Sequence, residues 1–491
     1  MSRKNAMATK RVSLIVFLVG LLAAGIGIDA EAADHPVAVG TTAVDCDTFD
    51  GGVNPGDTLT LLGTSRGAIS FNDCRGTASR PITIRNDTSE SGPIVISVSG
   101  SGFKVPCTDC EHVVIDGTGK WSGAPPGTCG VTVSGGSWTF GRNQCGIVVR
   151  CSRGDPVSIV HFKGSSTAFT IKGVEVDGNY PTCTNGYALY INDHTYKLSE
   201  HPGEWREDIR ILNNYLHSSE GSNIYFGSNH DEEGSDDLFL RNNEIAYNIV
   251  EDAGCDGMKT KRVIEGSSSI HHNYVNRTGI KIGANPTTGC TSSGIRVKGG
   301  FTEIHSNIVK NTGMESIGGG GGITQIIQKL PVTEFPRMPI SIYNNVVHET
   351  GGSGITILRQ DMTDSQPVPE IYNNTVVAPI VGSGIQCASS VSTRGIIRDN
   401  IVAGEGVNEG PCASTNNRTG TPVAQRFIDL AKDDFRLTTS SSARNAGGNC
   451  PSADLVETAR PQEGECDQGA FEYTSNITAA RPNPPSNFSA Q

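Results

Sequence analysis

The sequence predicts an all-β fold, a right-handed parallel β-helix solenoid in which short strands wind into stacked coils. Three observations predict it: a phrase that recurs about every 30 residues, a composition rich in glycine, and apolar residues that alternate with a period of two. Of the 491 residues, 60 are glycine and only 6% of the chain is aromatic. Evenly spread glycine and asparagine suit many short strands joined by tight turns.

The recurring phrase is an apolar or long residue, a polar residue, Asn, any residue, and then Ile, Val or Leu. The intervals between its asparagines are 29, 30, 34, 38, 29 and 26 residues, and the asparagines are Asn214, Asn243, Asn273, Asn307, Asn345, Asn374 and Asn400. A drifting period in this range indicates stacked units with insertions in their loops. Asparagine tolerates left-handed backbone and can bond to a copy of itself one coil away, so we expect a structural ladder at one turn. The leucine pattern of leucine-rich repeats is absent, and a period of two excludes helical repeats.

The first 32 residues have the pattern of a secretory signal peptide. Basic residues precede an apolar run at 12–28, and the small residues of Ala30-Glu31-Ala32 follow it. The run is short for a membrane span, and no later stretch is apolar enough to cross a bilayer. We therefore expect a secreted protein (extracellular, periplasmic or at the cell surface) without a membrane span in its mature form.

The remaining chain is expected to divide into four parts. An N-terminal cap and first coils occupy 33–110, the parallel β-helix 111–410, and a closing segment 411–473. Residues 474–491 are polar and rich in proline, which predicts a disordered tail.

Fourteen cysteines, an even number, predict disulfides in an exported protein. Spacing along the chain suggests four pairs, although spacing alone does not fix connectivity: Cys46–Cys74, Cys255–Cys290, Cys387–Cys412 and Cys450–Cys466. Cys107 and Cys110 have a spacing found in zinc sites, but no second half of such a site follows nearby.

The formal charge is −12, and loss of the signal peptide removes four basic and two acidic groups to leave −14. An acidic surface argues against nucleic acid as a partner, because that binding depends on neutralising phosphates. An acidic polysaccharide remains a suitable partner if its groove is locally basic. We expect the protein to act as a monomer.

Strand alternation identifies outward-facing candidates in the middle of the chain. Met258 and Thr260 are expected to face inward, so Lys259 and Lys261 face outward and toward solvent. The same alternation turns outward the following residues in neighbouring segments: Tyr225, Lys281, Arg296, Lys298, Thr324, Thr356 and Gln386.

Because coils stack about 4.8 Å apart, we expect Tyr225, Lys259 and Lys281 to form an outward ladder with Lys261 beside it. Five outward-facing cations lie within 40 residues of an acidic protein, which favours a binding or catalytic groove; they are Lys259, Lys261, Lys281, Arg296 and Lys298. The alternative is a solvated face whose lysines discourage strand aggregation.

The segment Asp256–Lys261 resembles the D-G-x-x-x-K phrase of the ninth polysaccharide-lyase family. The entry of the chain (54–59 and 76–85) and its end (434–437 and 467–472) also resemble those of secreted bacterial β-helix proteins, so the resemblance covers most of 40–473. It implies the β-helix fold and a calcium ion held by Asp256.

Beyond Asp256 the resemblance is incomplete. That family supplies further acidic ligands from its next coil, where this chain reads Arg277-Thr278-Gly279, and Arg296 falls near the family's catalytic lysine. Another β-helix lyase family pairs a lysine base with an arginine acid, which Lys261 or Lys281 with Arg296 would resemble. The usual calcium ligand set is therefore incomplete, and cations replace it.

These features favour a polysaccharide lyase that cleaves a uronic-acid polymer by β-elimination. Lys261, Lys281 and Arg296 are the expected catalytic residues, and Lys259, Tyr225 and Lys298 the expected substrate-binding residues. A non-catalytic cell-surface or glycan-binding β-helix is the alternative. A glycoside hydrolase comes third, because it would need two outward carboxylates about 5–10 Å apart, which the outward ladder does not offer.

Two further clusters contain residues that could form a site. Residues 230–237 are acidic and contain glycine, which suits calcium but lacks the spacing of a known calcium loop, so a solvated insertion is favoured. His271 and His272 could act as acid or base, yet His272 occupies the polar position before the turn Asn, which favours a structural role.

Overall fold

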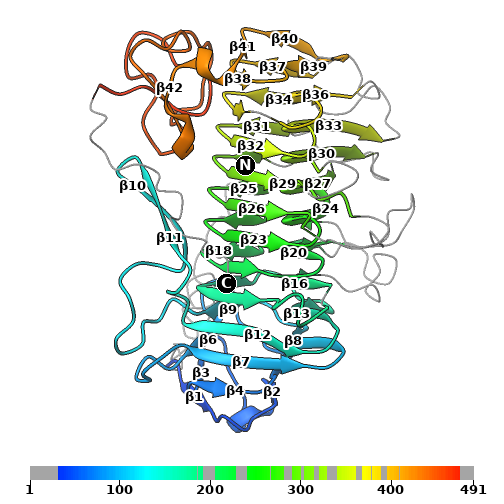
Figure 1. The fold of residues 1–491 in the computed structure, drawn as a ribbon. Helices are drawn as coiled ribbons and strands as arrows, with labels where there is room; N and C mark the ends of the chain where they lie inside the picture. Colours follow the sequence, from blue (N-terminus) through cyan, green and yellow to red (C-terminus); the bar gives the residue numbers. More distant parts are fainter. Residues whose placement is uncertain are drawn as a thin grey trace, which may run out of the picture.

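The computed structural model forms a right-handed parallel β-helix, as the sequence predicted. Its coils stack from the first strand at one end to β40 and β41 at the other (Figure 1). The described residues contain three short 3-10 helices and no α-helix: η1 (Phe49–Gly51), η2 (Pro422–Gln425) and η3 (Leu430–Lys432). The structure describes residues 31–184, 186–191, 205–227, 240–265, 267–280, 290–299, 303–314, 320–328, 340–360, 368–377, 379–388, 395–408 and 410–475.

Each coil contributes one strand to each of three parallel sheets. Among the described residues, sheet 1 has 13 strands: β1 (Asp34–Val37), β3 (Thr58–Leu61), β6 (Ile82–Asn86), β9 (Val113–Asp116), β14 (Thr170–Lys172), β18 (Arg210–Leu212), β22 (Glu244–Ala246), β25 (Ser269–His271), β28 (Glu303–His305), β31 (Ile340–Tyr343), β34 (Pro369–Tyr372), β37 (Ile396–Arg398) and β40 (Ala413–Thr415). Sheet 2 has 12 described strands: β4 (Ser65–Arg66), β7 (Ile94–Ser99), β12 (Ile147–Arg153), β15 (Val174–Asp177), β19 (Tyr215–His217), β23 (Ile249–Ala253), β26 (Tyr274–Thr278), β29 (Ile308–Thr312), β32 (Val346–Thr350), β35 (Thr375–Val377), β38 (Ile401–Ala403) and β41 (Arg418–Gly420).

Sheet 3 carries the candidate site, and two short strands pair beside its main path. Its 14 described strands are β2 (Ala43–Asp45), β5 (Ser70–Asn72), β8 (Gly102–Thr108), β13 (Pro156–Lys163), β16 (Tyr187–Ile191), β20 (Ser222–Phe226), β24 (Met258–Glu265), β27 (Ile295–Gly299), β30 (Ile323–Gln328), β33 (Ile355–Gln360), β36 (Ile385–Cys387), β39 (Val407–Asn408), and the short β17 (Arg206–Glu207) and β21 (Leu240–Arg241). Two antiparallel pairs lie outside the sheets: β10 (Gly130–Ser134) with β11 (Ser137–Gly141), and β42 (Phe427–Asp429) with β43 (Asp434–Leu437).

The turn from sheet 1 to sheet 2 carries the predicted asparagine ladder. Asn273 shows its bonding: its side-chain oxygen accepts the backbone N–H of Asn248 at 3.0 Å, and its amide donates to the Asn307 oxygen at 3.0 Å. The residue before each ladder asparagine adopts the left-handed conformation, as His272 does with φ of 52°. The described ladder consists of Asn214, Asn248, Asn273, Asn307, Asn345, Asn374, Asn400 and Asn417.

The prediction that Asn243 belongs to the ladder is wrong. Asn243 lies one turn earlier, between sheet 3 and sheet 1, where its oxygen accepts the backbone N–H of Ile209 at 3.0 Å. Asn248 takes the ladder position instead. Asn243 and Asn248 are each followed, two positions later, by an apolar residue (Ile245 and Val250), so the phrase matches at either turn. Only the backbone register distinguishes the two asparagines.

The interior of the solenoid is a column of β-branched side chains. Isoleucine and valine from all three sheets are fully buried, for example Ile224, Val250 and Ile304 at 0% exposure. Each coil buries its apolar face only against its neighbours, so stability comes from stacking. The rings of Phe162 and Phe169 stack within this core with centroids 3.7 Å apart.

All fourteen cysteines form disulfides. The four pairs suggested by spacing are confirmed, and Cys107 bonds to Cys110. The two remaining bonds are Cys129–Cys145 and Cys151–Cys183. Seven disulfides fit an oxidising compartment, and among the described residues no helix has the length and apolar character needed to cross a membrane.

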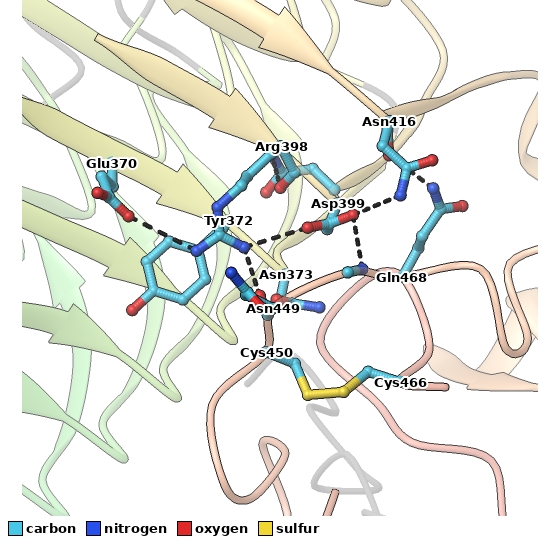
Figure 2. Close-up of polar contacts among 12 residues, drawn as sticks. Glu370, Tyr372, Asn373, Arg398, Asp399, Asn416, Asn449, Cys450, Cys466 and Gln468 are labelled. Atoms are coloured by element: carbon cyan, nitrogen blue, oxygen red, sulfur yellow. Dashed lines mark hydrogen bonds and ion pairs between the residues drawn. A yellow bond between two sulfur atoms is a disulfide. The ribbon is translucent and has the colours of Figure 1, made fainter. Parts of the chain in front are cut away.

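The β10–β11 hairpin and the C-terminal segment lie along the side of the solenoid (Figure 1). Figure 2 shows how the C-terminal segment is held: Arg398 of β37 lies over the ring of Tyr372, pairs with Glu370 at 3.5 Å and Asp399 at 3.1 Å, and donates to the carbonyl of Asn449. These contacts bind the segment to the turn between sheets 1 and 2.

Candidate functional site

Sheet 3 brings together most of the residues that the sequence singled out. Parallel pairing sets Tyr225 of β20 opposite Lys259 of β24, and Lys259 opposite Arg296 of β27. The intervening Met258 and Ile295 are fully buried in the core. Tyr225, Lys259 and Arg296 therefore form one outward column with coils about 4.8 Å apart.

A second pair of cations lies beside the first. Lys261 of β24 is opposite Lys298 of β27, two residues along from Lys259 and Arg296 on the same face. We call Lys259, Lys261, Arg296 and Lys298 the cation strip. Two adjacent strands thus present four cationic side chains on one side of the solenoid.

The position expected for Lys281 is occupied by Arg296. Residues 279 and 280 lie in the turn that follows β26, where the backbone N–H of Gly279 donates to the carbonyl of Cys255 at 2.8 Å and that of Ile280 to Ala253 at 3.2 Å. Among the described residues, the strand that follows β24 in sheet 3 is β27, so Arg296 and not Lys281 lies opposite Lys259. Lys281 itself lies outside the described residues, and its catalytic role stays a prediction.

The cation strip points away from the core but is not exposed, so the expectation that its lysines face solvent is wrong. Lys259 is 9% exposed, Lys261 4% and Lys298 5%. The ammonium groups of Lys259 and Lys261 lie 5.1 and 5.6 Å from the centroid of the fully buried Tyr225 ring. Cation–π attraction holds the two ammonium groups near the ring, and partial removal from water strengthens their attraction for any anion that reaches them.

The outer column continues on both sides of the cation strip. Toward the C-terminal end it runs through Thr324, Thr356 and Gln386, as the alternation predicted. Toward the N-terminal end it runs through Tyr190 and His161, which the sequence reading missed.

The missed rings form a cluster with Tyr225, in which His161 stacks on Tyr190 and the edge of one of the Tyr190 and Tyr225 rings meets the other. The His161 and Tyr190 centroids are 5.0 Å apart, those of Tyr190 and Tyr225 5.4 Å, and those of Tyr187 and Tyr225 4.7 Å. The alternation of Tyr187-Ala188-Leu189-Tyr190-Ile191 could have identified this strand. The column thus passes from aromatic to cationic to hydroxyl and amide groups.

Asp256, the expected calcium ligand, is fully buried just before β24. Its Oδ1 accepts hydrogen bonds from the Thr291 hydroxyl at 2.8 Å and the Ser293 backbone N–H at 2.9 Å, and its Oδ2 lies 3.9 Å from Nη1 of Arg296. Calcium takes six to eight oxygen ligands. Two hydrogen-bond donors and a guanidinium around one carboxylate do not fit that ion.

A different group of potential metal ligands lies on sheet 2. Within the described ranges, Glu175, Asp177 and His217 place ligand atoms within 4.8 Å of one another. The guanidinium of Arg150 lies 2.7 Å from Asp177 and 3.6 Å from Glu175, and His217 Nε2 lies 3.3 Å from Glu175. Protein groups already balance these carboxylates, so the cluster is accounted for by its own ion pairs.

His272 has the structural role that the sequence favoured. Its ring stacks on Tyr247 with centroids 5.0 Å apart and lies 6.2 Å from that of Trp138. Burial, and then the neighbouring His271, lower the pKa of His272 to about 3, so the ring is neutral at physiological pH. The acidic insertion at 230–237 lies outside the described residues.

Sheet 1 carries a further column of rings on its outer face. His271, His305, Tyr343 and Tyr372 stack with centroids 4.8–5.0 Å apart and planes within 13° of parallel. Arg398 covers the last ring, as Figure 2 shows. The faces of these rings therefore contact one another or Arg398, so a ligand would meet the ring edges.

Comparison with known proteins gives likeness in fold. No protein-family model matches the sequence, and no curated protein matches it. The crystal structure of pectate lyase Pel9A is 14% identical over 91% of this chain and 97% of that chain, with a TM-score of 0.49. The PL6 family polysaccharide lyase Pedsa3628 from Pseudopedobacter saltans is 13% identical over 83% of this chain and 99% of that chain, with a TM-score of 0.38.

A third match is a lacto-N-biosidase. The GH136 lacto-N-biosidase from Eubacterium ramulus is 13% identical over 80% of this chain and 68% of that chain, with a TM-score of 0.41. Identities this low concern the arrangement of strands and not the chemistry. The chain is a right-handed parallel β-helix.

Proposed function

We propose that this protein is a secreted polysaccharide lyase that cleaves a uronic-acid-containing polymer by β-elimination. The observation that supports the proposal is the cation strip: four cations on two adjacent strands of a chain whose formal charge is −12. A polymer that carries a carboxylate on its acidic sugars matches such a strip in charge. Low exposure of the lysines increases that attraction.

β-Elimination makes three demands on the site. A base removes the proton on C5, the electron pair left behind forms the C4–C5 double bond, and the bond from C4 to the leaving oxygen breaks as that oxygen gains a proton. A cation beside the uronate carboxylate stabilises the negative charge that develops when C5 loses its proton.

The strip supplies groups for each demand. Lys261, which lies opposite Lys298 and on the same strand as Lys259, is assigned as the base. Arg296 is assigned to the carboxylate and the leaving oxygen, and Lys259 and Lys298 to the carboxylates of the bound chain. Tyr225 packs beneath the lysines and sets the position of their ammonium groups.

The test is a screen of the purified protein against pectate, alginate, rhamnogalacturonan and glycosaminoglycans, with ultraviolet absorbance reporting unsaturated product. We expect absorbance to rise with one uronate polymer. Arg296→Ala should weaken both binding and turnover, while Arg210→Ala, an exposed arginine on sheet 1, should change neither. Release of no unsaturated sugar from any of these polymers would show that the lyase proposal is wrong, and binding without cleavage would favour a glycan-binding solenoid.

A further inference from the structure

Two coils of the site are fastened together just before their strands of sheet 3. The disulfide Cys255–Cys290 joins the turn that leads into β24 to the turn that leads into β27. The backbone N–H of Gly257 also donates to the carbonyl of Ser293 at 2.9 Å. The strands fastened in this way are the two that carry the cation strip.

Asp256 lies at the centre of this junction. It follows Cys255 in the chain, and its Oδ1 bonds to Thr291 and Ser293 of the next coil at 2.8 and 2.9 Å. A fully buried carboxylate is costly unless hydrogen bonds and a counter-charge compensate it. Here the two donors fix one oxygen, and the second oxygen faces the guanidinium of Arg296 at 3.9 Å.

The consequence is a fixed direction for Arg296. Ser293 comes three residues before Arg296, so the same carboxylate holds both the start of β27 and the head of its arginine. The Arg296 side chain is only 11% exposed, and the register places it opposite Lys259. An arginine oriented by a buried partner offers a planar fork that suits a carboxylate.

We infer that Asp256 is a positioning residue that holds Arg296 as a protein-borne cation, and that the site neutralises a uronate without a divalent metal. This inference rests on the proposed function and deepens it. Calcium at Asp256 would set a second cation beside Arg296 on a single carboxylate whose other oxygen already accepts two hydrogen bonds. The coil that would supply further acidic ligands reads Arg277-Thr278-Gly279.

The test is a double-mutant cycle with Asp256→Asn, Arg296→Gln and both together. Binding of a short oligogalacturonate and a short oligoalginate is measured by calorimetry, once with EDTA and once with calcium chloride. We expect Asp256→Asn to weaken binding about 10- to 100-fold in the wild-type background and to have no further effect once Arg296 is replaced. Asp177→Asn, which removes a carboxylate paired with Arg150 on sheet 2, is the matched control and should leave binding unchanged.

Calcium distinguishes the two roles of Asp256. If Asp256 positions Arg296, the wild type binds sugar equally well in EDTA and in calcium chloride. Titration of calcium alone into the metal-free protein then gives the same heat for the wild type and for Asp256→Asn. Calcium-dependent binding that Asp256→Asn abolishes, or equal losses from Asp256→Asn with and without Arg296, would overturn the inference.

Two readouts keep the inference separate from the proposed function. The same cycle measured on the unfolding midpoint reports the coupling of Asp256 to Arg296 without any sugar. If neither oligosaccharide binds, the midpoint cycle and the calcium titration still decide the role of Asp256, and the polymer screen separately decides the proposed function. Should Asp256→Asn not fold, Thr291→Val removes one hydrogen bond to the carboxylate and keeps its charge, and it should weaken binding in the same direction.

Discussion

Arg142 and Glu251, which are 109 residues apart in the chain, form a two-point ion pair on the outer face of sheet 2. Nε of Arg142 donates to Oε2 at 2.8 Å, and Nη2 donates to Oε1 at 2.7 Å. Glu251 is fully buried, and the guanidinium also lies 5.9 Å from the centroid of Tyr215. The pair fixes the base of the β10–β11 hairpin to the solenoid.

Arg142→Ala should therefore destabilise the protein by about 3–5 kcal/mol, because it leaves a buried carboxylate without its counter-charge. Denaturant unfolding measures the loss. Arg150→Ala is the matched control: Arg150 pairs with Asp177 on the same sheet but is 49% exposed, so about 0–1 kcal/mol is expected. Equal losses from the two variants would contradict a special role for the buried pair.

Asn307→Ala should destabilise the fold by about 1–3 kcal/mol. The Asn307 oxygen accepts the backbone N–H of Asn273 at 3.0 Å, and its amide donates to the carbonyl of Ile270 at 2.9 Å, so the variant leaves both buried groups without these partners. Asn408→Ala, at an exposed position of β39, is the control and should be neutral. If both variants unfolded at the same temperature as the wild type, the ladder would contribute little to stability.

Stability of the N-terminal coil should depend on pH through His35. Burial alone would lower its pKa, but hydrogen bonds to Asp50 and Asp57 outweigh burial and raise the pKa above 6.5. Burial would raise the pKa of Asp57, yet backbone N–H groups of Ala33 and Asn54, and then His35, lower it below 3.8.

The contribution of His35 is therefore complete below pH 6.5 and is lost as pH rises through its raised pKa, whereas that of Asp57 is present above pH 3.8 and is lost as pH falls through its lowered pKa. His35→Gln should cost most stability between these two values and progressively less at alkaline pH. Unfolding midpoints of both proteins from pH 4 to 9 check this, and a difference that grows with pH would contradict it.

Lys261→Ala should lower turnover on the uronate polymer by about 10²–10⁴, which is the usual worth of a positioned base. The measurement is the initial rate of unsaturated product at saturating polymer. Lys432→Ala, at a lysine that is 55% exposed on the C-terminal segment, should leave the rate unchanged. A Lys261→Ala protein that retains the wild-type unfolding midpoint and full turnover would remove Lys261 from the catalytic groups.

The sequence was sufficient for the fold because each coil repeats a local rule. From β18 to β40, the turn after each described strand of sheet 1 has two residues, the first left-handed and the second an asparagine, and the phrase around it is visible without coordinates. Its failure at Asn243 has a local cause: Asn242 and Tyr247 are both left-handed and both precede an asparagine. A motif of five letters cannot tell two such turns of the same coil apart.

The site was predicted less completely than the fold. Lys259, Lys261, Arg296 and Lys298 could be placed because alternation within a strand is local. Lys281 was expected opposite Lys259 because Gly279-Ile280-Lys281-Ile282-Gly283 alternates like a strand, but strand pairing is a non-local property and sets Arg296 of β27 at that position. Burial of the lysines and the contact of Asp256 with Arg296 also depend on neighbouring coils, which alternation does not describe.

Because the two-residue turn is constant, coils of different length keep the same register at the asparagine ladder. Consecutive ladder asparagines are as few as 17 and as many as 38 residues apart, yet each bonds to the next in the same way. The variation enters elsewhere, for example between Thr278 and Ile295, on the way into the strand that carries Arg296. Segments bordering the cation strip can therefore be lengthened, shortened or exchanged during evolution without disturbing the stack, so a change of preferred polymer need not cost the protein its fold.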